Sequence, residues 1–153
     1  MIEVNERIDV PAPPDEVWKL LSDPRAVVDC VPGAAIGETH EDGSFDATMI
    51  IKFGPAKVTF KAVATLDLDE ATRSGKVSSK GKDNQGGTRF NAAMNFKVVE
   101  QPAGSAIEIK ANVEITGRLS SLVESGASLV VKYMTNEFSK RLAARFTGTE
   151  AHK

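Results

Sequence analysis

Cysteine and histidine are scarce in this sequence, which contains one cysteine, Cys30, and two histidines, His40 and His152. A single cysteine cannot form a disulfide within the chain, and no group of cysteines and histidines has the spacing of a zinc site. The sequence therefore excludes disulfide-stabilised secreted domains and zinc modules. We expect neither a metal site nor a bound cofactor.

Long apolar runs and an excess of charge of one sign are also missing. No stretch approaches the roughly 18 consecutive apolar residues of a membrane span, and Glu3, Glu6 and Arg7 do not suit a signal peptide. The 19 Lys and Arg residues are balanced by 21 Asp and Glu residues, which gives a net charge of −2. A nucleic-acid-binding protein is therefore not expected. A cytoplasmic protein is the default interpretation.

The N-terminal part of the chain predicts one strand and two short helices. Apolar and polar residues alternate over residues 2–10, which is the pattern of a half-buried strand. Prolines at positions 11, 13 and 14 end this strand, and Asp15 and Glu16 favour the first turn of a helix. Asp23 is a candidate N-cap for a second helix beginning at Pro24.

Residues 34–116 predict six more strands, because alternating segments are separated only by short turns rich in Gly, Asp and Asn. Short connections favour an antiparallel meander with one face exposed to water. The period then changes to 3.6 over residues 117–146, which predicts one long amphipathic helix. Ser121 and Glu124 have the spacing of a capping box at its start.

This order of elements predicts an α+β helix-grip fold, because the apolar face of a sheet must be covered and the last helix is available to cover it. We expect a seven-stranded antiparallel sheet curved around a long C-terminal helix, with two short helices between strands 1 and 2. The chain length suits one domain, which we assign to residues 1–147, followed by a short tail at 148–153.

A resemblance to a known family rests mainly on the N-terminal segments. They read Val10-Pro11-Ala12-Pro13, Val17-Trp18, Leu20-Leu21, Asp23-Pro24 and Cys30-Val31-Pro32-Gly33-Ala34. This pattern resembles the signature of the carbon monoxide dehydrogenase G-subunit family (CoxG), within the START-like (SRPBCC, Bet v 1-like) superfamily. The resemblance continues through Gly117-Arg118-Leu119 to about Phe146.

The resemblance implies a non-enzymatic accessory protein of a molybdenum hydroxylase, similar to those that help to bring carbon monoxide dehydrogenase to the cytoplasmic membrane. Many members carry an apolar C-terminal segment linked to membrane attachment, whereas this sequence has seven residues after Phe146. We therefore expect any membrane contact to be weak and peripheral, at the inner face of the cell membrane, and to be made by the domain itself or by a partner.

Small residues are frequent on the predicted inner faces of the sheet and the helix. Either the helix packs close to the sheet or a cavity is left between them, and the superfamily resemblance favours the cavity. The small residues are Ala47, Ala62, Ala64, Ser79, Gly81, Ala92, Ala111, Gly126 and Ala127. The predicted ligand-binding walls are Met49, Phe60, Phe90, Met94, Phe96, Val130, Met134 and Phe138.

Other polar or reactive residues are better explained by structure than by chemistry. We expect Glu6 to be a solvated residue at a strand end or bulge, His40 to lie on the surface, and Cys30 to be buried, since it lacks a nearby base. The glycine-rich segment 81–87 is interpreted as a hairpin turn. A basic outer face, either solvated or contacting anionic lipid or an acidic partner, is expected from Arg73, Lys76, Lys80, Lys82, Arg89 and Lys97.

Taken with the resemblance, these features predict an accessory protein that binds a hydrophobic small molecule, such as a lipid or a quinone, and supports a molybdenum hydroxylase complex. We predict no catalytic residues and no nucleic-acid partner. Two alternatives stay open: a START-like enzyme of the cyclase or hydrolase type, and a purely structural adaptor with a filled core.

Overall fold

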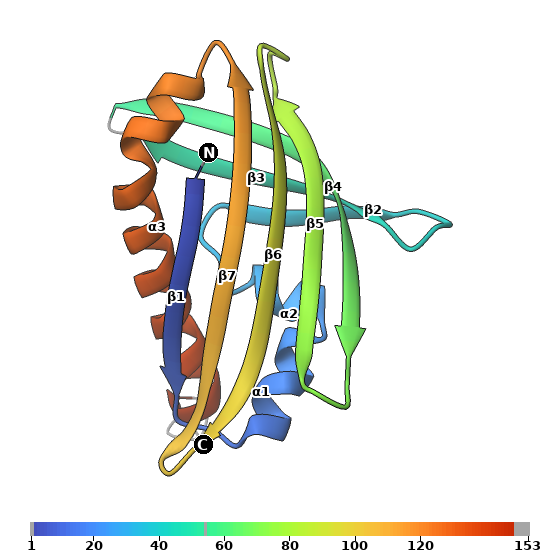
Figure 1. Cartoon of the computed structure of the whole chain (residues 1–153), viewed down its shortest axis with the longest axis vertical. Helices are drawn as coiled ribbons and strands as arrows, with labels where there is room; N and C mark the ends of the chain where they lie inside the picture. Colours follow the sequence, from blue (N-terminus) through green and yellow to red (C-terminus); the bar gives the residue numbers. More distant parts are fainter. Residues whose placement is uncertain (1, 54, 149–153) are drawn as a thin grey trace.

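The strands expected from the alternating pattern form one antiparallel sheet in the order β1-β7-β6-β5-β4-β3-β2, shown in Figure 1. This computed structural model describes residues 2–53 and 55–148. Most of the tail expected at 148–153 lies outside the described residues. The strands are β1 (Ile2–Val10), β2 (Ala34–Thr39), β3 (Phe45–Phe53), β4 (Ala56–Asp69), β5 (Ser74–Asp83), β6 (Thr88–Gln101) and β7 (Gly104–Gly117).

The helices lie where the sequence predicts them. Helices α1 (Pro14–Leu21) and α2 (Pro24–Val28) connect β1 to β2, and Asp23 caps α2 by accepting a hydrogen bond from the Arg25 amide at 3.1 Å. The long helix α3 (Ser120–Ala143) continues as a π-helical turn, η1 (Ala144–Gly148). Figure 1 shows α3 running beside β1, so the expected helix-grip fold is confirmed.

The start of α3 differs from the expected capping box, which is wrong. The helix begins at Ser120, so Ser121 is already inside it, and no side-chain cap is made by its N-cap residue Leu119. Instead, the Leu119 amide donates a hydrogen bond to the Thr88 hydroxyl of the neighbouring strand at 2.8 Å. Gly117 adopts a φ of 113°, and a Cβ there would overlap the carbonyl of Gly87, so only glycine suits this tight junction.

Thr88 is fully buried and belongs to a small polar network that holds the β5–β6 turn against the start of α3. Its amide donates to Asp83 Oδ1 at 2.8 Å, and this bond, with further amides of the turn, holds the pKa of the Asp83 carboxyl below its usual range. The network therefore joins the turn to the helix through the Thr88 hydroxyl.

Replacing Thr88 by valine is expected to lower the free energy of unfolding by about 1–3 kcal/mol, because the Leu119 amide would lose its partner in a part-buried site. Urea denaturation measures the change. The matched control is Thr116→Val on the exposed face of β7, which should change stability by less than about 0.5 kcal/mol. Equal losses in the two variants would contradict this role of the Thr88 hydroxyl.

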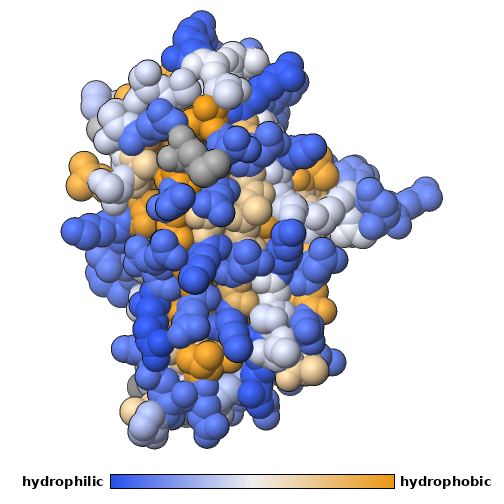
Figure 2. All heavy atoms as spheres, in the orientation of Figure 1, coloured by the Kyte–Doolittle hydropathy of each residue, from blue (hydrophilic) through white to orange (hydrophobic). Residues whose placement is uncertain are grey.

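The expected basic outer face needs a correction at Arg73. This residue lies in the β4–β5 turn with a φ of 50°, not on a strand, and its guanidinium is 2.6 Å from the Asp15 carboxylate. The lysines of β5 and β6 do point outward, as expected from the register of the sheet. Figure 2 shows one face of the molecule, which carries mostly hydrophilic residues with smaller apolar areas between them.

Candidate functional site

A cavity of about 560 Å³ lies between the inner face of the sheet, helix α3 and the α2 segment, residues 24–31. Its volume is nearly four times that of the roughly 150 Å³ engineered cavity that accommodates benzene. It also falls within the range of roughly 300–1,000 Å³ typical of small-molecule sites. The space is therefore sufficient for a molecule of several rings or for a long chain.

Small residues on adjacent strands create this space. Ala47 of β3 pairs with Ala62 of β4, and Ser79 of β5 lies between Ala64 and Ala92 on its two neighbours. All five residues line the cavity. Of the two alternatives left open by the sequence, the structure therefore shows a cavity, because α3 does not approach the sheet closely enough to fill the room above these short side chains.

The hydrophobic core is consequently divided into two clusters, one at each end of the cavity. The Trp18 cluster includes Trp18, Phe96 and Leu142, with the first two rings 6.1 Å apart between centroids. The Phe53 cluster includes Phe53, Phe60 and Val123, and Phe60 packs edge-on against Phe90 at 5.6 Å. Aromatic rings that belong to or pack on these clusters, including Phe60, Phe90 and Phe96, also line the cavity.

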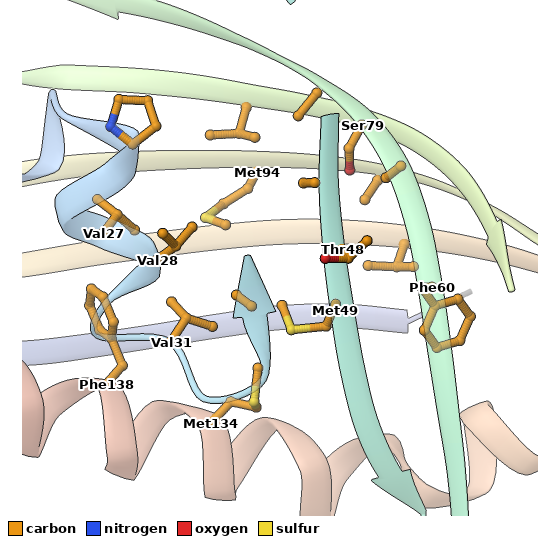
Figure 3. Close-up of a pocket in the computed structure, with 18 of the residues that line it drawn as sticks. Val27, Val28, Val31, Thr48, Met49, Phe60, Ser79, Met94, Met134 and Phe138 are labelled. Atoms are coloured by element: carbon orange, nitrogen blue, oxygen red, sulfur yellow. The ribbon is translucent and has the colours of Figure 1, made fainter. Parts of the chain in front are cut away.

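Most of the predicted wall residues do meet at this cavity. Val130 is the exception, since it packs against the Phe53 cluster and does not line the cavity. In Figure 3, Met134 and Phe138 lie on α3 and Met94 lies on the sheet. The lining residues among those predicted are Met49, Phe60, Phe90, Met94, Phe96, Met134 and Phe138. Their role in ligand binding stays a prediction.

One wall of the cavity was missed from the sequence. The α2 segment contributes Val27, Val28 and Val31, and β2 contributes residues 34–36. A helix of five residues shows no usable periodicity, so its buried side could not be assigned. The only signal in the sequence was a run of valines that such a short helix cannot bury by itself.

The described residues that line the cavity include no charged side chain and no His, Cys or Tyr. The polar side chains are limited to the hydroxyls of Thr48, Ser79 and Thr135. General acid–base catalysis needs groups whose pKa values suit proton transfer, and nucleophilic catalysis needs an activated nucleophile. The wall provides neither, whereas it can bury a large apolar molecule and offer it a few hydroxyl groups.

The remaining candidate residues lie outside the cavity wall. Glu6 is half-buried on the inner face of β1, beside Ile8, and the register of β1 with β7 is continuous, so the expected strand end or bulge is wrong. Cys30 is buried, and this burial raises the pKa of its thiol. His40 is exposed and bonds Asp46 at 2.8 Å, which raises its pKa. Both interpretations from the sequence are confirmed for Cys30 and His40.

Metal binding and membrane insertion find little support in the part of the chain that the structure describes. These residues contain no group of three or more His, Cys, Asp or Glu side chains arranged to hold a metal ion. None of the helices within the same residues is long and apolar enough to cross a bilayer.

The sequence profile of CoxG, the G subunit of carbon monoxide dehydrogenase, matches residues 7–147. The chain belongs to the CoxG family. The match includes every helix and strand except the beginning of β1, as well as all of the residues that line the cavity. No curated protein sequence gives a significant match.

Solved structures place this CoxG family member among START-like folds. A conserved protein from Geobacillus kaustophilus is 19% identical, with a TM-score of 0.74 over 93% of this chain and 95% of that one. A START superfamily protein from Mycobacterium smegmatis is 14% identical, with a TM-score of 0.58 over 92% and 96%. An aromatase/cyclase from Streptomyces sp. R1128 is 15% identical, with a TM-score of 0.65 over 97% of each chain. At these identities, the comparisons show the shared fold alone.

Proposed function

We propose that this member of the CoxG family is a non-catalytic carrier of a hydrophobic molecule, a lipid or a quinone, that supports a molybdenum hydroxylase. The observation that carries the proposal is the cavity of about 560 Å³ with a wall free of charged side chains. An apolar ligand in such a cavity exchanges contact with water for contact with apolar atoms, which is favourable. Membership of the CoxG family supports the accessory role.

The same wall restricts the chemistry of the ligand. A charged group moved into an apolar interior without a partner loses its hydration at a large cost. No Lys or Arg side chain lines the cavity to pair with a carboxylate or a phosphate. The buried part of the ligand should therefore be neutral, and a charged head group would have to stay at the mouth in water.

The enzymatic alternative is less well supported. Similar structures include an aromatase/cyclase, but the residues lining this cavity offer hydroxyl groups and no acid, base or activated nucleophile. We further propose that the protein contacts the inner face of the cell membrane weakly and reversibly, so that it can exchange a membrane-derived ligand.

Displacement of a neutral fluorescent probe, N-phenyl-1-naphthylamine, tests the cavity and its neutrality together. At pH 7.5, dodecanol should displace the probe with an apparent affinity about tenfold or more above that of dodecanoate, because the two ligands have the same chain length and differ in charge. Extraction and mass spectrometry of the purified protein should also recover a neutral apolar molecule. A protein that binds no probe, or that binds both competitors equally, would contradict the proposal.

A further inference from the structure

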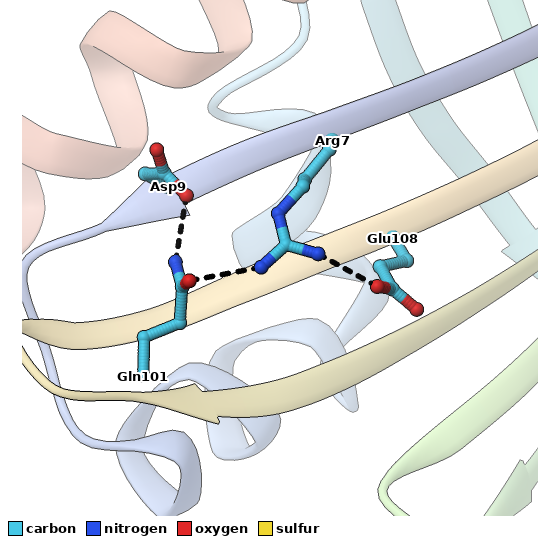
Figure 4. Close-up of polar contacts among 4 residues, drawn as sticks. All are labelled: Arg7, Asp9, Gln101 and Glu108. Atoms are coloured by element: carbon cyan, nitrogen blue, oxygen red, sulfur yellow. Dashed lines mark hydrogen bonds and ion pairs between the residues drawn. The ribbon is translucent and has the colours of Figure 1, made fainter.

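The outer face of the sheet has two halves that differ in how their charges are paired. In one half, opposite charges meet: Lys97 lies directly across from Glu108, and Arg7 reaches the same carboxylate at 2.8 Å. Figure 4 shows this half, where Gln101 accepts a hydrogen bond from Arg7 and donates one to Asp9 at 2.7 Å. Charges here are neutralised within the sheet itself.

The other half contains only basic charges, which form a basic strip of Lys52, Lys57, Lys61, Lys82 and Arg89. The register places Lys52 opposite Lys57, Lys61 opposite Lys82, and Lys82 opposite Arg89. All five side chains are exposed, and none has an ion pair or side-chain hydrogen bond with another described residue. Like charges directly opposite one another destabilise a sheet, so the strip has a cost that a bound anionic surface would relieve.

We propose that the basic strip is the surface through which the protein contacts an anionic lipid bilayer. This inference rests on the membrane contact proposed above and is independent of what the cavity holds. It identifies which face of the domain meets the lipid, since β3, β4, β5 and β6 all contribute to the strip.

The composition of the strip favours lipid over an acidic protein. Four of its five residues are lysines, and it has no aromatic side chain, whereas protein interfaces are enriched in Arg, Tyr and Trp and depleted in Lys. Lysine is a flexible point charge that does not require a partner of fixed geometry, which suits mobile lipid head groups. Ile50, next to Lys52 on the outer side of β3, is 43% exposed and can enter the head-group region.

Two triple variants with the same net charge separate the strip from a general charge effect. K61Q/K82Q/R89Q removes three strip residues, and the control K76Q/K97Q/K110Q removes three exposed lysines from the other half, so both change the net charge from −2 to −5. Sedimentation with phosphatidylcholine vesicles containing about 30% phosphatidylglycerol is measured at about 50 mM and about 500 mM NaCl.

The wild type should bind at low salt and lose most of its binding at high salt, because lysine–lipid attraction is screened within a Debye length. Each strip residue should contribute up to about fivefold, so the strip variant should bind roughly 10- to 100-fold more weakly, while the control stays within about threefold of the wild type. Equal losses in both variants would overturn the proposal, since only net charge would then matter.

Two further arms complete the test. If the wild type binds soluble poly-glutamate through the strip but ignores the vesicles, an acidic protein is the partner; the lipid assignment and the proposed membrane contact then fail, while probe displacement still judges the cavity. The single variant Lys82→Glu turns two like-charged pairs into two opposite-charged pairs. Its midpoint of thermal unfolding should rise by about 2 °C while its vesicle binding falls, and unchanged vesicle binding would contradict the proposal.

Discussion

Replacing Ala92 by leucine is expected to weaken binding of N-phenyl-1-naphthylamine by about tenfold or more while leaving the fold as stable as before. Ala92 lines the cavity on β6, opposite Ser79, where its methyl group leaves room. The larger side chain would occupy space that the probe needs, and overlap with a well-packed ligand costs about 1–3 kcal/mol. Its own burial against apolar neighbours should offset any strain, so the free energy of unfolding should change by less than about 1 kcal/mol.

The matched control for this variant is Ala106→Leu. Ala106 is fully buried and does not line the cavity, so added methylene groups have no free space there. This control should lose about 1–3 kcal/mol of stability and should keep its affinity for the probe. If Ala92→Leu were the more destabilising of the two, the cavity would have to be closed in solution, and the carrier function would lose its main support.

Truncating Leu142 to alanine should cost about 2–5 kcal/mol of unfolding free energy, the largest single effect that we expect. Leu142 is fully buried in the Trp18 cluster, where α3 packs against β1 and the first helix, so its removal leaves an unfilled hole. Met94→Ala is the comparison, because Met94 is half-buried and faces space that is already empty. It should cost less than about 1.5 kcal/mol.

Urea denaturation of the two variants measures this difference directly. A cost at Met94 as large as that at Leu142 would mean that the middle of the core is as well packed as its lower end. The comparison also separates two functions of the core: the Trp18 cluster holds α3 to the sheet, and the middle layer forms the walls of the cavity.

Strong periodicity explains why most of the fold and most of the cavity wall could be predicted. Alternation on β6 places Phe90, Met94 and Phe96 on one face whatever the neighbouring strands do. Position along a wide helical face is less certain, because it depends on how α3 is rotated against the sheet. Val130 and Met134 are four residues apart on α3, yet only Met134 reaches the cavity.

Features that depend on register could not be read from single segments. The expected capping box assumed that α3 would satisfy its own first turn, whereas Thr88 provides the acceptor from a distant strand. The basic strip likewise requires three registers at once, those of β3 with β4, β4 with β5, and β5 with β6. Lys52, Lys57 and Lys61 were therefore not recognised as neighbours of Lys82.

The charge-free cavity wall has a consequence for how cargo would be unloaded. Because none of the described lining residues titrates between pH 5 and pH 9, acidification cannot reverse the sign of any interaction with a neutral guest inside the cavity. Discharge would then depend on a change of shape. The α2 segment is the element suited to such a change, since its five-residue helix has no fully buried residue of its own and provides three valines to the cavity.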